Sequence, residues 1–153
     1  MMKKFKFSPS VLFILTFIAG ISLSWILPVE MTRFIEHDVT LILGLSFLFI
    51  SLILNFMAYR MFKDHATPHA PFSTPTNLID KGIFAFSRNP VYLALVLSQC
   101  GLGFVFDTVW LMLMAIILLI FLHFFIVLDE EKMLQNRFKE KYECYKERTR
   151  RWF

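Results

Sequence analysis

The chain has 153 residues, of which 57% are hydrophobic, and it includes 19 phenylalanines. Soluble chains contain only about 45–50% apolar residues, so this composition excludes a compact soluble domain and indicates a single domain in lipid. The net charge of +4 comes from basic residues that flank apolar runs, which favours a membrane surface as the partner and argues against nucleic acid.

Four apolar runs have lengths suited to membrane-crossing helices. We therefore predict an all-α membrane protein with four transmembrane helices, at about residues 11–27, 39–59, 90–106 and 109–128. The first run follows a basic start but has no clear signal-peptidase motif, so we expect it to be retained. A proline-rich polar connection of about 26 residues lies at 64–89, a length that is usually functional or disordered.

The distribution of basic residues predicts how the chain is oriented. Of the 16 Lys and Arg residues, all except Arg33 lie on one side of the predicted spans. By the positive-inside rule, both termini, loop 64–89 and tail 129–153 are expected in the cytosol. The compact chain carries no organelle signal, which suggests a bacterial inner membrane.

The tail that follows the fourth run keeps a helical pattern. Its apolar residues recur at steps of 4, 4 and 3, at Leu134, Phe138, Tyr142 and Tyr145. This spacing predicts an amphipathic C-terminal helix, which continues from the fourth span and then bends along the membrane surface.

Two polar segments stand at the cytosolic ends of the third and fourth runs. Arg88 and Tyr92 are four residues apart at the start of the third, and Glu130 and Glu131 follow the fourth. Each has a simple alternative, because Arg88 could reach the headgroups and the acidic pair could mark where the helix leaves the membrane. Because these residues lie at the same depth and on the same side, we predict that they line one polar pocket. In it, Arg88 could bind a carboxylate. A glutamate could accept hydrogen bonds from a ribose diol or pair with an ammonium group.

These segments resemble the isoprenylcysteine carboxyl methyltransferase and phospholipid methyltransferase family, integral-membrane enzymes that use S-adenosylmethionine. The resemblance covers about residues 65–152. It rests on Leu78-Ile79-Asp80-Lys81-Gly82-Ile83-Phe84-Ala85-Phe86-Ser87-Arg88-Asn89-Pro90-Val91-Tyr92-Leu93, and on Glu130-Glu131-x-x-Leu134-x-x-x-Phe138-x-x-x-Tyr142-x-x-Tyr145 followed by Arg151-Trp152.

The resemblance implies which residues hold the cofactor and which act in catalysis. It implies S-adenosylmethionine binding by Gly82, Arg88, Asn89, Pro90, Tyr92, Glu130, Glu131 and Tyr142, with Glu131 and Arg148 also catalytic and Arg148 orienting an anionic acceptor. The chain departs from the family pattern at Ile83 and Phe84, where Pro-Tyr is usual, and at Lys139, where glycine is usual. These departures weaken the inference about the acceptor more than the inference about the cofactor.

The resulting hypothesis is an S-adenosylmethionine-dependent methyltransferase with a hydrophobic or membrane-associated acceptor. Candidate acceptors are an isoprenylcysteine-type carboxylate, a phospholipid amine and a small thiol. The alternative is a non-catalytic membrane scaffold or subunit that retains the fold. The sequence leaves the oligomeric state open.

Other polar residues carry weaker signals. His65 and His69 are four apart, but nearby prolines argue against the regular helix that a metal site would need, so no metal is predicted. His123 lies within the fourth run and is either functional or a hydrogen-bonded packing residue. Asn55 and Gln99 are expected to form hydrogen bonds between helices. Cys100 and Cys144 are too distant for a disulfide framework or a metal motif.

Overall fold

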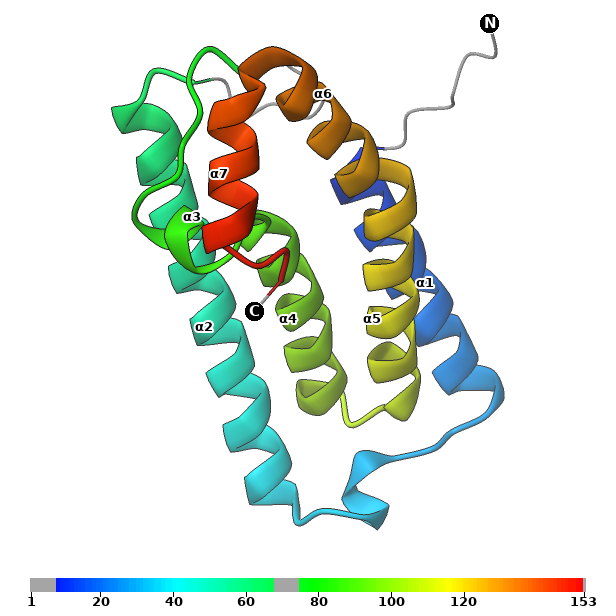
Figure 1. Cartoon of the computed structure of the whole chain (residues 1–153). Helices are drawn as coiled ribbons and strands as arrows, with labels where there is room; N and C mark the ends of the chain where they lie inside the picture. The colour runs from blue at the N-terminus through cyan, green and yellow to red at the C-terminus, as the bar shows by residue number, and fades with distance from the viewer. Residues whose placement is uncertain (1–7, 68–74, 153) are drawn as a thin grey trace, which may run out of the picture.

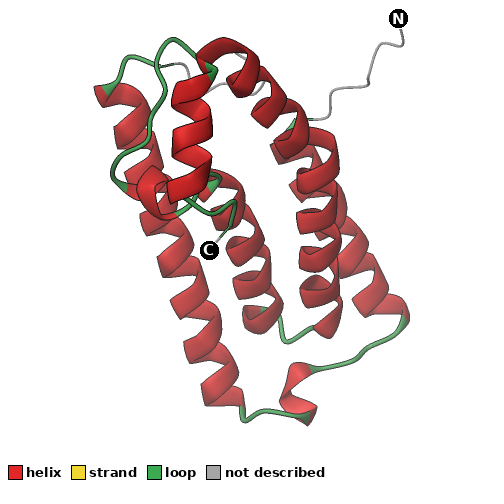
Figure 2. Ribbon diagram, viewed as in Figure 1, coloured by secondary structure: helices red, strands yellow, loops and turns green. Residues whose placement is uncertain are grey.

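The computed structural model describes residues 8–67 and 75–152, and every regular element within them is a helix (Figure 2). Lys3, Lys4, Lys6 and His69, which entered the predictions above, lie outside the described residues. The elements are α1 (Pro9–Ile26), the 3₁₀ turn η1 (Met31–Arg33), α2 (His37–Asp64), α3 (Ile83–Phe86), α4 (Pro90–Val105), α5 (Val109–Leu122), the π-helical turn η2 (His123–Val127), α6 (Leu128–Phe138) and α7 (Glu140–Arg148).

The long helices run side by side. In Figure 1, α4 lies between α2 and α5, and α1 packs against α5. The turn at Asp107 and Thr108 makes α4 and α5 antiparallel, as predicted, and the Thr108 side chain caps α5 by accepting from the Trp110 N–H. Beyond η2, α6 continues α5, and α7 then turns back beside α3. The short helices thus gather at one end, where the site is built.

The outer surface of the helices is apolar over a wide area. On α2, the side chains of Phe49, Leu52 and Phe56 are 64%, 67% and 60% exposed, and their spacing of three and four places them on one helical face. A face of this kind would be unstable in water and suits contact with lipid tails.

Among the residues that the structure describes, three helical stretches are long and apolar enough to cross a membrane: α1, α2 and the continuous stretch Val109–Phe138. The fourth predicted span corresponds to α4, which has 16 residues. At 1.5 Å per residue it is about 24 Å long, shorter than the roughly 30 Å of hydrocarbon in a bilayer. The count of four spans is therefore not confirmed.

Polar side chains join the helices inside the apolar environment. The Thr16 hydroxyl of α1 donates to the Gln99 Oε1 of α4 at 2.9 Å, and the Ser51 hydroxyl of α2 donates to the Ala94 carbonyl of α4 at 2.9 Å. Gln99 therefore links two helices as expected, whereas Asn55 donates to the Ser51 carbonyl within its own helix at 3.2 Å.

The tail differs from the single amphipathic helix that was expected. It consists of two helices, because Lys139 adopts a positive φ of 47° with ψ of −119° and ends α6 after Phe138. L-residues other than glycine rarely adopt this conformation. The break reverses the chain, so that α7 packs back toward α3.

Candidate functional site

A cavity of about 410 Å³ lies at the end of the helices where α6, α7 and the loop before α3 meet. Its volume falls within the roughly 300–1,000 Å³ that is usual for small-molecule sites. Its wall includes seven of the predicted site residues: Arg88, Asn89, Pro90, Tyr92, Glu130, Glu131 and Tyr142. The other part of the wall is mostly apolar and includes Phe62, Val91, Leu95 and Leu134.

Pro90 starts α4 and thereby positions Tyr92, one of the polar side chains of the cavity wall. Proline at the first position of α4 suits a helix start, because its fixed φ is helical and its missing N–H would be unpaired there in any case. Tyr92 then lies in the first turn of α4, and its hydroxyl donates to Glu130 Oε1 at 2.6 Å. This hydrogen bond connects the start of α4 to α6.

Glu131 is the centre of a charged cluster. The Arg151 guanidinium donates to both of its carboxylate oxygens, from Nε to Oε1 at 2.9 Å and from Nη2 to Oε2 at 2.7 Å. Arg88 Nη1 approaches Oε1 at 3.2 Å. The side chains of Arg88 and Glu131 are only 11% and 14% exposed, so the pair is held largely out of water.

Arg88 retains unused hydrogen-bonding capacity. Its Nε and Nη1 atoms are buried; Nη1 has only the 3.2 Å ion contact with Glu131, which lacks hydrogen-bond geometry, and Nε has no hydrogen-bond acceptor within the described part of the chain. Buried donors without partners are rare and costly, especially when charged. Since Arg88 lines the cavity, its guanidinium fits an anionic group entering from that side.

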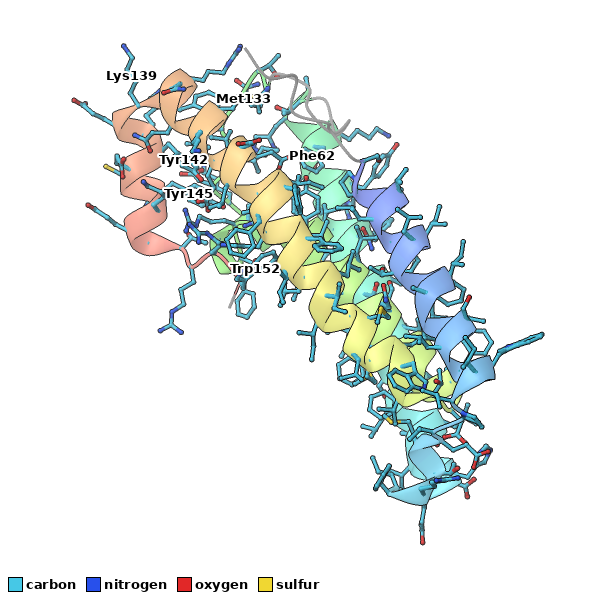
Figure 3. The ribbon with its side chains drawn as sticks, turned by 90° about the vertical axis from the view of Figure 1, so that its right-hand side faces the viewer. Phe62, Met133, Lys139, Tyr142, Tyr145 and Trp152 are labelled. Carbon is cyan, nitrogen blue, oxygen red and sulfur yellow. The ribbon has the colours of Figure 1, made fainter. Side chains whose placement is uncertain are left out.

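Two tyrosines of α7 close the cavity on the tail side. In Figure 3, Tyr142 and Tyr145 lie on the side of α7 that faces α6. The Tyr145 hydroxyl donates to the Phe84 carbonyl at 2.6 Å, which joins α7 to α3. Burial and the Glu131 carboxylate raise the pKa of Tyr142 to about 12, opposed by the neighbouring arginines Arg88 and Arg151. Tyr142 is therefore a neutral hydrogen-bond donor at physiological pH.

The C-terminal segment, residues 149–152, docks across the start of α4. The Arg88 N–H donates to the Arg150 carbonyl at 3.1 Å, and the Asn89 side-chain amide donates to the Arg151 carbonyl at 3.0 Å. Trp152 packs against a buried cluster that includes Tyr92 and Leu122, with its ring centroid 6.4 Å from that of His123. His123 thus has a packing neighbour and lies outside the cavity wall.

The structure leaves two predicted site residues, Gly82 and Arg148, outside the cavity wall. Arg148 has a 67% exposed side chain and pairs with Asp80 at 3.3 Å. Gly82 has a φ of +59°, and a Cβ atom there would lie 2.8 Å from Met61 Sδ. The backbone conformation and the close packing of α2 therefore account for this glycine.

The comparison with known families now bears on this geometry. The sequence model of the phospholipid methyltransferase family matches residues 39–141. The chain belongs to this family. A search of curated proteins and a search of solved structures each found no match.

Membership in the phospholipid methyltransferase family implies methyl transfer to a lipid-related acceptor, and with the three long apolar helices it makes the chain an integral membrane protein. The matched region contains both halves of the charged pair, Arg88 and Glu131, and the hydrogen-bonded pair Tyr92 and Glu130. It ends before Tyr142 and before the C-terminal segment.

Arg151 and Asn55 were not predicted as site residues. Arg151 contacts the site only because the chain reverses at Lys139, which the helical periodicity of the tail conceals. Asn55 lines the cavity from the middle of an apolar helix, where a polar residue is in itself a signal of function or of hydrogen bonding.

Proposed function

We propose that this family member is an S-adenosylmethionine-dependent methyltransferase that binds its cofactor in the cavity described above. The observation that carries the proposal is the buried Arg88 guanidinium at the cavity wall, whose Nε has no acceptor and whose Nη1 has only a 3.2 Å ion contact with Glu131. This donor and acceptor set fits a ligand that bears both a carboxylate and hydroxyl or ammonium groups.

In this proposal Arg88 binds the carboxylate of the cofactor, and Glu130 accepts from its ribose hydroxyls or pairs with its ammonium group. Tyr92 fixes the orientation of Glu130 through the 2.6 Å hydrogen bond. Asn89, Pro90, Glu131 and Tyr142 complete the wall. When bound, the cofactor would supply a methyl group activated by its sulfonium. The protein then contributes alignment of the reactants and exclusion of water.

A carboxylate on a lipophilic molecule fits best among the candidate acceptors. The described residues of the cavity wall include no His, Lys or Cys, and the two glutamates that could accept a proton are held by Tyr92 and Arg151. A carboxylate needs no proton removed before methylation, whereas an ammonium or a thiol does. The apolar part of the wall, with Phe62, Val91 and Leu95, suits a hydrocarbon chain.

The proposed setting is a bacterial inner membrane with both termini in the cytosol and α4 as a short fourth span. The distribution of basic residues supports this orientation. Lys63, Lys81 and the basic tail lie at the same end of the helices as the cavity, whereas Arg33 lies at the opposite end. A cofactor would then enter from the cytosol and a lipophilic acceptor from the bilayer.

Calorimetry with purified protein in a neutral detergent tests the cofactor. We expect the wild type to bind S-adenosylmethionine. We expect Arg88→Ala and Glu131→Ala to weaken binding by roughly 30-fold or more, because removing one partner of a buried charge pair costs about 2–5 kcal/mol. Arg150→Ala and Glu147→Ala, at exposed positions with the same charges, serve as controls.

The possible results distinguish a wrong function from a wrong binding site. Folded wild-type protein that binds neither S-adenosylmethionine nor S-adenosylhomocysteine would leave only a scaffold role. Normal binding by both site variants would instead show that the cofactor sits elsewhere. Incubating membranes with methyl-labelled cofactor, followed by alkaline hydrolysis, identifies the acceptor, because a carboxyl methyl ester releases its label as methanol and a methylated amine does not.

A further inference from the structure

The two arginines that contact Glu131 share it unequally. Arg151 grips both carboxylate oxygens, at 2.9 and 2.7 Å, in the fork geometry that arginine forms with carboxylates. Arg88 has one longer approach, 3.2 Å from Nη1 to Oε1. The carboxylate is thus committed to the tail and only loosely shared with the residue that faces the cavity.

The backbone around Arg151 is fixed by hydrogen bonds to two successive carbonyl groups. Its carbonyl accepts from the Asn89 amide at 3.0 Å and from the Ser87 hydroxyl at 3.4 Å. The preceding carbonyl, of Arg150, accepts from the Arg88 N–H at 3.1 Å, and Trp152 packs into the apolar core. The guanidinium of Arg151 therefore projects from a fixed backbone, outside the cavity wall.

This arrangement has a consequence for Arg88. A carboxylate as buried as Glu131 will form a fork with whichever arginine is available. With Arg151 present, Arg88 Nε has no hydrogen-bond acceptor in the described part of the chain, and Nη1 has only the 3.2 Å contact with Glu131. Without Arg151, Glu131 can turn fully to Arg88 and form the fork with its Nη1 and Nη2 atoms, which leaves only Nε for an anion in the cavity.

We infer that Arg151 is a positioning residue: by holding Glu131, it keeps the Arg88 guanidinium free to bind the carboxylate of the ligand. The inference rests on the proposed function, because it concerns the same cavity and cofactor. It assigns the C-terminal segment a role in ligand selectivity that is separate from closing the cavity.

A pair of ligands that differ only in one carboxylate gives the test. S-adenosylmethionine and its decarboxylated analogue are titrated by calorimetry into the wild type, Arg151→Ala, Arg151→Lys and the control Arg150→Ala, which removes an exposed arginine next to it. We expect Arg151→Ala to weaken binding of S-adenosylmethionine about tenfold, the scale of one charge-assisted hydrogen-bond pair, and to change that of the analogue less than about twofold.

Arg151→Lys keeps the charge but not the fork, so we expect an intermediate loss that again affects only the carboxylate-bearing ligand. It also provides the test if Arg151→Ala does not fold. A purely structural role would weaken both ligands equally, and that result overturns the inference, as does unchanged binding in both Arg151 variants. Wild-type protein that binds neither ligand refutes the proposed function and is recognised before any variant is compared.

Discussion

Lys139 is the residue on which the shape of the tail depends. It ends α6 with a φ of 47° and a ψ of −119°, a backbone region that is essentially reserved for glycine. A residue held there costs about 1–3 kcal/mol, and the packing of α7 on α3 must offset that cost. In Figure 3, Lys139 lies at the junction of α6 and α7.

We therefore predict that Lys139→Gly stabilises the protein by about 1 kcal/mol, because glycine adopts this conformation without strain. The midpoint of thermal unfolding in detergent measures the effect. Lys141→Gly, two residues later inside α7, is the matched control and should destabilise by about 0.5–1 kcal/mol. A lower midpoint for Lys139→Gly than for the wild type would contradict the explanation.

Individual contacts of the site were predictable to different degrees. The meeting of Arg88 and Tyr92 with the two glutamates follows from the sequence, because charged residues at the same end of adjacent antiparallel helices must lie close together. The fork between Arg151 and Glu131 does not, because it depends on one positive φ that lysine rarely adopts. A glycine at position 139 would have indicated a turn in the sequence.

At the scale of elements, the pairing of α2 and α4 depends on two glycines. A Cβ atom at Gly101 would lie 2.9 Å from the Gly44 carbonyl oxygen, and one at Gly44 would lie 3.0 Å from the Gly101 carbonyl oxygen. The two backbones touch directly, as small residues allow in membranes. Nothing in the sequence identifies Gly44 as the partner of Gly101, because the pairing of helices is not encoded in hydropathy.

Gly44→Ala should therefore destabilise the protein by about 1–3 kcal/mol, because the new methyl group pushes two backbones apart. The loss is measured from the midpoint of unfolding by a denaturing detergent. Ser46→Ala, on the exposed face of the same helix, is the control and should change the midpoint little. Equal effects of the two substitutions would show that the helices can separate without cost.

The helix that starts at Val109 continues beyond the apolar run, as the periodicity of the tail predicted. The apolar run ends at Leu128, and the helix continues through Glu130 and Glu131 to Phe138. Backbone hydrogen bonding does not depend on the polarity of side chains, so a change in composition need not end a helix. The wide turn η2 was not predictable, since its residues, His123–Val127, carry no signature of π geometry.

For the whole molecule, the proposed orientation places the cavity on the cytosolic side of the membrane. The two natural cysteines report on it, since Cys144 is exposed on α7 and Cys100 is partly buried in α4. We predict that a membrane-impermeant maleimide labels the protein in inverted vesicles and not in intact spheroplasts. Cys144→Ser should abolish the labelling, and Cys100→Ser should not. Labelling in spheroplasts would reverse the proposed orientation.

The largely buried Arg88 also affects the choice of detergent. If Arg88 binds an anion as proposed, the apolar wall beside it also suits an amphiphile with an acidic headgroup. Bile-salt detergents and free fatty acids carry such headgroups and should compete for the cavity, whereas maltosides have no charge to offer. Solubilisation in cholate would thus mask the very site that a binding assay sets out to measure.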